Sequence, residues 1–196
     1  MFLDRDGTIN VEIGYLHEPE KFRFEVGVPE ALRMLKDAGY KLVVVTNQGA
    51  VGRGMYTEDD LRRTNEFMQR ELMKKGVALD GIYYCIHRKE EGCHCRKPEP
   101  GMMLKAMEDL QLSPDQSWMI GDKLKDIEAG KRSGLRTILV LTGYGVTERQ
   151  ELENLEKCVR SSLQPSYIAP TLKEAAMFIL QAAEELSKNL NSSPQQ

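Results

Sequence analysis

The sequence predicts an α/β fold built on a mostly parallel sheet, and three observations lead to this prediction. Strand-like apolar runs alternate with helical patterns almost to the end of the chain. The clearest run, residues 40–46 (YKLVVVT), is β-branched like a strand that is buried on both faces. Chemically useful polar residues follow several of these runs, where parallel sheets bind their ligands. We therefore expect helices on both faces of the sheet.

The elements follow in order from local patterns. Residues 1–4 form the end of a short strand. A helix over 29–38 has Pro29 at its start and Gly39 after its end. Thr57, with Asp60 three residues later, begins a helix that runs to about residue 75. Similar patterns predict strands at 79–85, 117–120, 135–141 and 166–169 and helices at 100–110, 124–133, 147–155 and 171–186.

Composition limits the classes of function. The 196 residues suffice for one domain, which we place at residues 1–186, followed by a polar, disordered tail at 187–196. Lys and Arg total 27 against 30 Asp and Glu, and this net charge of −3 argues against a general nucleic-acid binder. No apolar run is long enough to cross a membrane, and no secretory signal is recognisable. We expect a cytoplasmic protein without membrane or nucleic-acid partners, and nothing requires more than a monomer.

Two carboxylates, Asp4 and Asp6, leave the first strand on the same side of the extended chain. One carboxylate can attack phosphorus, and the other can donate a proton to the leaving oxygen and then accept one from water. Their mutual repulsion predicts a divalent cation nearby. An isolated pair of this spacing is usually a surface turn, but the preceding strand and the following Gly7-Thr8 favour the catalytic interpretation.

Two later segments can complete such a site. Asp122 and Asp126 share one side of a helix start, where oxygen ligands suit Mg²⁺ and where helix capping is the alternative. Lys97 can meet a phosphoryl oxygen and Arg96 can bind a second phosphate or a sugar, although a solvated basic pair is common.

A segment rich in small residues follows the second strand. Thr46 offers a hydroxyl, and the turn around Gly49 offers backbone N–H groups to an anion. Taken alone this signal is weak, because glycine-rich turns are common.

Three of the four cysteines and two of the three histidines lie within residues 85–95. The set Cys85, His87, Cys93 and Cys95 has the composition of a closed, four-ligand structural zinc site. His94 lies between two ligands and should point away, and Cys158 stands apart as a plain thiol. We therefore predict a zinc-bound loop that ends at the basic pair Arg96-Lys97.

Together these segments resemble the haloacid dehalogenase (HAD) superfamily of phosphotransferases. Within it, the chain is most similar to the heptose bisphosphate phosphatases, and the likeness runs from residue 1 to about residue 145. The matching stretches are 2–10 (FLDRDGTIN), 14–15 (GY), 43–48 (VVVTNQ), 81–85 (GIYYC), 95–102 (CRKPEPGM) and 121–124 (GDKL). The resemblance implies a HAD-like Rossmannoid three-layer sandwich without a separate cap domain.

The resemblance also implies a role for each matching residue. Asp4 would be the nucleophile and Asp6 the general acid and base, with Thr46 and Lys97 neutralising the phosphoryl oxygens. Mg²⁺ would be held by Asp4, the backbone carbonyl of Asp6 and Asp122, and zinc by the Cys/His set. Contacts to a small phosphorylated sugar would come from Glu12, Ile13, Gly14, Tyr15, Asn47, Gln48, Gly49, Arg53, Arg96 and Lys123. The implied reaction removes the C7 phosphate of a heptose 1,7-bisphosphate.

Two departures keep alternatives open. Asp4 is only the fourth residue, so the first strand is expected to be short. Five residues separate His87 from Cys93, a compact spacing that matches the related histidinol-phosphate phosphatases and keeps histidinol phosphate as an alternative substrate. A zinc-stabilised binding protein without activity is the third interpretation, and the presence of Asp4, Asp6, Lys97 and Asp122 argues against it.

Overall fold

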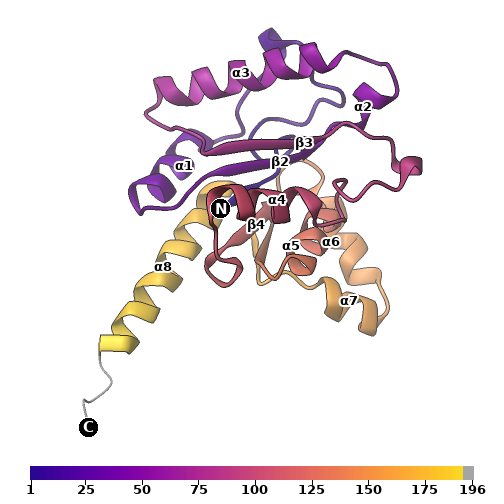
Figure 1. Ribbon diagram of the computed structural model, residues 1–196. Coiled ribbons are helices and arrows are strands. Elements are labelled where there is room, and N and C mark those ends of the chain that lie inside the picture. The colour runs from indigo at the N-terminus through magenta and orange to yellow at the C-terminus, as the bar shows by residue number, and fades with distance from the viewer. Residues whose placement is uncertain (192–196) are drawn as a thin grey trace.

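The computed structural model describes residues 1–191 and contains one six-stranded parallel sheet (Figure 1). The strand order is β3-β2-β1-β4-β5-β6. The connections between the parallel strands are crossovers that contain helices. The strands are β1 (Phe2–Leu3), β2 (Val43–Asn47), β3 (Gly81–Cys85), β4 (Trp118–Gly121), β5 (Arg136–Val140) and β6 (Tyr167–Ala169). The predicted α/β class is confirmed, and β1 is as short as expected.

Eight α-helices and three 3-10 turns connect these strands within residues 1–191. The helices are α1 (Val28–Asp37), α2 (Gly49–Gly52), α3 (Glu58–Lys74), α4 (Gly101–Leu110), α5 (Leu124–Arg132), α6 (Gly145–Asn154), α7 (Lys157–Leu163) and α8 (Leu172–Asn191). The turns are η1 (Pro19–Lys21), η2 (Lys89–Glu91) and η3 (Pro114–Gln116). No helix in the described part of the chain is both long and apolar enough to span a membrane.

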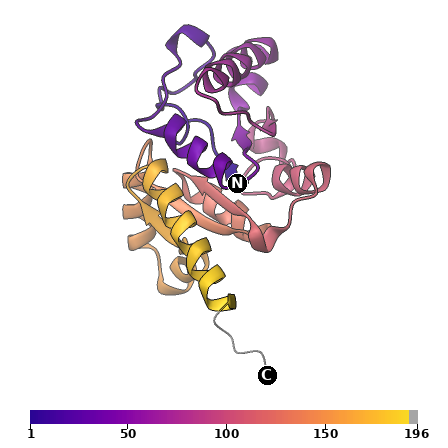
Figure 2. The ribbon, with the colours of Figure 1, turned by 90° about the vertical axis from the view of Figure 1, so that its left-hand side faces the viewer.

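Successive residues of each strand point to opposite layers. Leu3 packs in one cluster with residues of α1, α3 and α8, whereas Phe2 packs in a second cluster with residues of α4 and α5. Val44 and its neighbour Val45 divide between the two clusters in the same way. The sheet therefore lies between two layers of helices, and Figure 2 shows α8 beside α1. The three-layer prediction is confirmed.

The elements differ from the predictions mainly after residue 140. Helix α6 begins at Gly145, two residues before the predicted start, and α7 was not predicted as a separate helix. The last helix continues to Asn191 and not to residue 186, so residues 187–191 are helical where a disordered tail was expected. Residues 192–196 of that predicted tail lie outside the described residues.

Candidate active site

The carboxyl ends of β1, β2 and β4 meet at one edge of the sheet because these strands are parallel neighbours. Asp4 directly follows β1, Thr46 lies near the end of β2, and Asp122 directly follows β4. All three residues are buried. The structure thus brings together predicted site residues that are separated by up to 118 positions in the sequence (122 − 4).

A small cavity of about 160 Å³ opens at this edge. Of the residues predicted for catalysis and substrate binding, those lining it are Asp4, Asp6, Glu12, Gly14, Tyr15, Thr46, Asn47, Gln48, Gly49, Arg53, Arg96 and Lys123. Lys97 and Asp122 are buried and do not line the cavity. Ile13 is 49% exposed and also stays outside it, so the structure does not place its side chain in the predicted substrate wall.

Lys97 is fixed by three oxygen atoms. Its Nζ lies 2.9 Å from Asp4 Oδ1 and 2.7 Å from Asp126 Oδ1, and it donates a hydrogen bond to the Val45 carbonyl at 2.7 Å. The backbone of Lys97 is held as well: its N–H donates to Asn47 Oδ1, and its carbonyl accepts from Asn47 Nδ2, both at 3.0 Å. The Asn47 side chain, predicted to contact substrate, therefore braces the loop that carries Lys97.

These contacts set the charge of the candidate nucleophile. Burial would raise the pKa of Asp4, but Lys97, followed by Lys123 and Lys125, outweighs burial and holds this pKa below its usual range. Burial would likewise lower the pKa of Lys97, but Asp126 and then Asp4 raise it above the ordinary value. Asp4 is therefore an anion beside a buried ammonium group, as a nucleophile that approaches phosphate requires.

Asp122 lies against the tight turn after β1. Gly7 has a φ of +81°, and a Cβ at this position would collide with the Asp122 carboxylate, so the turn requires glycine. Asp122 Oδ2 accepts a hydrogen bond from the Tyr144 N–H at 2.9 Å, whereas its buried Oδ1 has no hydrogen-bond partner. Burial and the nearby Asp4 raise the pKa of Asp122 to about 8.

An unpartnered carboxylate oxygen beside a second carboxylate fits a divalent cation. Oxygen atoms of Asp4, Asp122 and Asp126 lie within 4.8 Å of one another. Hard oxygen donors of this kind suit Mg²⁺. Asp126 is already engaged, because its Oδ1 faces Lys97 and its Oδ2 accepts from the Lys123 N–H at 3.1 Å. Asp126 thus caps helix α5 and anchors Lys97, which leaves Asp4 and Asp122 as the side chains available to a metal.

Asp6 is held by a hydrogen-bond network on the opposite side of the turn. Arg5 forms an ion pair with Asp6 at 2.9 Å, and Asn10 Nδ2 donates to Asp6 Oδ1 at 3.0 Å. Gln48 Nε2 donates to Asp6 Oδ2 at 2.7 Å and to Thr46 Oγ1 at 2.8 Å. The network fixes the carboxylate of Asp6 at the wall of the cavity.

A second group of residues forms the outer wall. Lys123 Nζ lies 3.1 Å from Glu12 Oε2, and Glu12 Oε1 accepts from the Gly14 N–H at 2.8 Å. Arg53 lies over the ring of Tyr15 at 5.3 Å from its centroid. These contacts hold the loop after β1 at the outer wall of the cavity.

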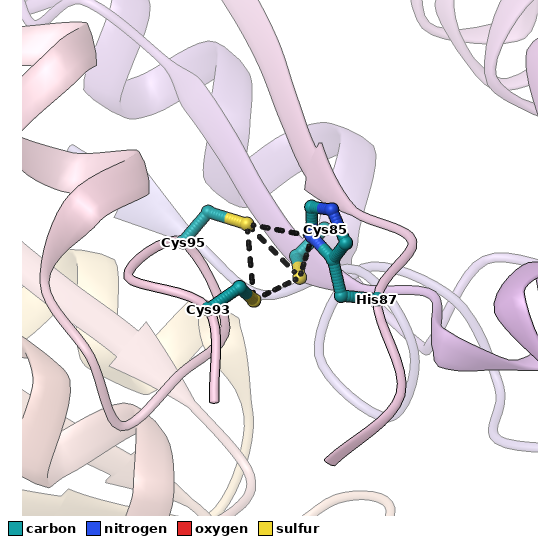
Figure 3. Close-up of side chains that lie close together, drawn as sticks. All are labelled: Cys85, His87, Cys93 and Cys95. Atoms are coloured by element: carbon teal, nitrogen blue, oxygen red, sulfur yellow. Dashed lines mark hydrogen bonds between the residues drawn. The ribbon is translucent and has the colours of Figure 1, made fainter. Parts of the chain in front are cut away.

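The Cys/His set forms a compact cluster beside the cavity. Figure 3 shows the side chains of Cys85, His87, Cys93 and Cys95 pointing toward one another. The sulfur atoms lie 3.2–3.5 Å apart, and His87 Nδ1 lies 3.2 Å from Cys95 Sγ and 3.6 Å from Cys85 Sγ. Around a tetrahedral zinc with bonds of about 2.3 Å, sulfur atoms lie about 3.8 Å apart, so the four donors are close to the required spacing.

Arg96 connects this cluster to the cavity. Its Nη1 donates to the His87 carbonyl at 3.1 Å. A Cβ at Gly49 would lie 2.8 Å from the same Nη1 and 2.9 Å from the His87 carbonyl oxygen, so only glycine allows this close approach. The loop that would hold zinc therefore orients a cation toward the cavity.

Three residues near the site were not predicted. Arg5 is fully buried and pairs with Asp6, and its Nη1 also donates to Asn65 Oδ1 at 3.1 Å. Tyr56 donates its hydroxyl hydrogen to Gln48 Oε1 at 2.6 Å, and burial raises the pKa of Tyr56 to about 12. Lys125 lines the cavity, and burial lowers its pKa below the ordinary value. The one available sequence signal was the position of Arg5 between the two candidate carboxylates Asp4 and Asp6.

A buried carboxylate follows β1, a second follows β4, and a buried lysine pairs with the first. This arrangement is the one expected of a hydrolase of the haloacid dehalogenase type. The family model of the haloacid dehalogenase-like hydrolases matches residues 26–134, and a second HAD-hydrolase-like model matches residues 94–175. The chain belongs to this family.

Individual relatives and solved structures show which members of this family the chain is similar to. The chain is 48% identical to the D-glycero-beta-D-manno-heptose-1,7-bisphosphate 7-phosphatase of Pasteurella multocida, over 76% of this chain and 84% of that protein. Identity to the protein of the same name from Escherichia coli K12 is 45%, over 83% and 88% of the two chains. The D,D-heptose 1,7-bisphosphate phosphatase of B. bronchiseptica, solved with magnesium and phosphate, superposes with a TM-score of 0.83 at 28% identity and covers 93% of this chain and 98% of its own.

Proposed function

We propose that this chain is a Mg²⁺-dependent phosphatase that removes the C7 phosphate of D-glycero-D-manno-heptose 1,7-bisphosphate. The observation that carries the proposal is the anionic Asp4, which lines the cavity and pairs with the buried Lys97, together with Asp6 at the cavity wall. The names of relatives at 45–48% identity support the choice of substrate.

The chemistry follows from the two aspartates. A carboxylate oxygen of Asp4 attacks phosphorus, and the bond between phosphorus and the C7 oxygen of the sugar breaks. Asp6 donates a proton to that leaving oxygen, which gives heptose 1-phosphate and an aspartyl-phosphate. In the second step the oxygen of a water molecule attacks phosphorus, and Asp6 accepts a proton from this water. The bond between phosphorus and the Asp4 oxygen breaks, which releases inorganic phosphate and restores Asp4. Lys97 and Thr46 face the negative charge of the phosphoryl oxygens during both steps.

Asp4, Asp122 and the backbone carbonyl of Asp6 would hold Mg²⁺, and the unpartnered Oδ1 of Asp122 supports this assignment. When bound, the cation neutralises charge on the transferred phosphoryl group. Two buried carboxylates that would otherwise repel each other are then compatible with one anionic substrate.

Cys85, His87, Cys93 and Cys95 would hold a structural Zn²⁺. Four protein donors leave no open coordination position, so we assign this site to loop stability and not to the reaction. Its effect on the reaction would pass through Arg96, whose guanidinium is bonded to the backbone of His87.

The proposal also covers the location, oligomeric state and partners of the enzyme. It would act as a monomer in the cytoplasm on a small phosphorylated sugar, with residues 1–186 as one domain and without nucleic acid or membrane. None of the four cysteines forms a disulfide within the described residues.

The test measures phosphate release with Mg²⁺ from heptose 1,7-bisphosphate and from histidinol phosphate side by side. We expect kcat/KM for the heptose to exceed that for histidinol phosphate by about 100-fold or more, since a buried polar site discriminates by at least this factor. Histidinol phosphate stays the second candidate because of the compact spacing between His87 and Cys93. A preference for histidinol phosphate would overturn the proposed substrate.

A further inference from the structure

The loop after β1 is fixed by few contacts, although it carries residues of the cavity wall. Residues 11–15 form no helix or strand, and four of the five are exposed. Leu16 then enters the core, and its carbonyl accepts a hydrogen bond from Arg5 Nη2 at 3.3 Å. The position of the segment before Leu16 therefore depends on individual polar contacts, because packing contributes little there.

His17 makes two contacts that bear on this wall. Its Nδ1 lies 2.7 Å from the Tyr15 carbonyl oxygen, and because a carbonyl can only accept, Nδ1 carries the hydrogen in this contact. Its ring stacks on the ring of Tyr56, with the centroids 5.0 Å apart and the planes inclined by 9°. Tyr15 and Tyr56 both line the catalytic cavity, whereas His17 lies outside it.

Tyr56 connects the stacked rings to the candidate catalytic groups. Its hydroxyl donates to Gln48 Oε1, and the Gln48 amide donates to Asp6 and Thr46. Tyr56 is only 8% exposed, so its ring offers a fixed surface to the imidazole. His17 therefore attaches the exposed wall loop to a ring that is held from the catalytic side.

We propose that His17 is a positioning residue that holds Tyr15 in the wall facing the leaving group of the phosphorylated substrate. The inference rests on the proposed function and adds a role for a side chain that touches no reacting atom. Without its two contacts, the backbone at Tyr15 moves away from the cavity, and the leaving group loses a surface against which it packs. The ion pairs and hydrogen bonds of Asp4 and Lys97 do not involve His17, so the phosphoryl-binding end keeps its geometry.

Glu18 marks the alternative role for His17, which is a surface ion pair. His17 Nε2 lies 3.8 Å from Glu18 Oε1, and Lys21 also pairs with Glu18. The three side chains are at least 36% exposed, and ion pairs at such positions contribute little because water and salt screen them. The contacts to Tyr15 and Tyr56 are therefore the ones that give His17 its role.

The test measures steady-state kinetics of variants that remove the two contacts together or separately. In His17→Ala, which removes both, we expect KM to rise about 10-fold while kcat changes less than about threefold. His17→Phe keeps a ring for stacking and His17→Asn keeps an N–H near the Nδ1 position, so each should recover part of the loss in KM. The Ki of inorganic phosphate, which occupies only the phosphoryl-binding end, should stay the same in all three variants.

Glu18→Gln is the matched control in the same loop. It removes the charge beside His17 Nε2 and leaves the contacts to Tyr15 and Tyr56 in place, so it should keep the wild-type KM and kcat. Backbone NMR order parameters of the unliganded protein supply a readout that needs no substrate. At residues 13–15 they should fall in His17→Ala toward the value of about 0.6 that marks flexible backbone, and not in Glu18→Gln.

The outcomes separate this inference from the proposed function. Kinetics are measured on heptose 1,7-bisphosphate and on histidinol phosphate, so a preference for histidinol phosphate overturns the proposed substrate and still provides a KM that tests His17. An unchanged KM in His17→Ala, or an equal rise in Glu18→Gln, would overturn the role of His17. So would a fall in kcat at constant KM, because the effect would then lie on the chemical step.

A purely structural role has its own signature. It would lower the Tm of His17→Ala and leave KM and kcat of the folded enzyme as in the wild type, which would contradict the inference. If the wild type hydrolyses neither substrate, the proposed function is wrong. Order parameters at residues 13–15 that keep their wild-type values in His17→Ala would then overturn the role of His17 as well, and lower values would support it.

Discussion

The two clusters that can hold metal differ in the origin of their ligands. The Cys/His cluster takes all four donors from residues 85–95, and each donor faces at least two of the others. The carboxylate cluster takes Asp4 from the end of β1 and Asp122 from the end of β4, and Asp122 Oδ1 has no partner. One cluster is closed upon itself, and the other is open toward a cavity.

This difference teaches what each cluster can do. A closed set of four donors completes the coordination of its metal without a substrate. The free energy of metal binding therefore stabilises the folded loop. The open set depends on groups from outside the protein, because two carboxylates cannot complete the coordination of Mg²⁺. The comparison predicts that substitutions of the carboxylates mainly lower kcat. Substitutions of the cysteines should mainly lower stability.

The largest effect is expected at the nucleophile. Asp4→Asn removes the attacking oxygen charge and should lower kcat by about 10³-fold or more, as for other enzymes that form covalent intermediates. The melting temperature should change little compared with this loss, because the amide keeps the shape of the side chain. Phosphate release and thermal unfolding measure the two effects, with the exposed Asp59→Asn as the control. Full activity in Asp4→Asn would rule out the covalent mechanism.

The closed cluster should behave in the opposite way. Removal of zinc by a chelator, or Cys93→Ser, should lower the Tm by about 10 °C, since the loop loses several kcal/mol of metal binding. The kcat of the surviving folded enzyme should fall less than its KM rises, because the loop orients Arg96 and supplies no reacting atom.

Cys158→Ser provides the matched control for the thiol change. Cys158 is exposed on α7 and lies far along the chain from the cluster, so its substitution should leave the Tm unchanged. An unchanged Tm after complete zinc removal would contradict the structural role.

The sequence alone predicted the parts of the site that depend on short spacing. Asp4 and Asp6 lie two residues apart, and the Cys/His set spans eleven residues (85–95), so local backbone geometry suffices to place them. The parallel sheet explained why Asp122 and Thr46 join them. What could not be predicted are contacts set by side-chain packing over long separations.

Asp126 and the C-terminal helix illustrate this limit. Whether Asp126 binds metal, caps α5 or anchors Lys97 depends on the position of a lysine 29 residues earlier (126 − 97). The end of α8 is a different case, because no Gly or Pro interrupts residues 172–191 and polarity alone suggested a tail. Polar residues such as Lys and Asn are compatible with a helix, so polarity marks exposure and not the helix end.

Asp126→Asn sharpens the comparison inside the open cluster. The substitution removes the charge that faces Lys97 Nζ at 2.7 Å, and we expect kcat to fall about 10- to 100-fold, equivalent to about 1.5–3 kcal/mol. The Mg²⁺ concentration for half-maximal activity should stay the same, because Asp126 is engaged with Lys97 and the N-terminus of α5. Asp37→Asn, at an exposed position, serves as the control. A tenfold higher Mg²⁺ requirement would identify Asp126 as a metal ligand.

The smallest effect is expected at Tyr56, which acts on Asp6 through Gln48. Its hydroxyl fixes the orientation of the Gln48 amide, so that Nε2 faces both Asp6 and Thr46. Tyr56→Phe removes one hydrogen bond worth about 0.5–1.5 kcal/mol and should lower kcat about 2- to 10-fold with little change in KM. Tyr84→Phe is the matched control, because Tyr84 packs in the same cluster but donates to Glu58 on the surface. Equal losses in both variants would show that packing, and not the orientation of Gln48, explains the effect.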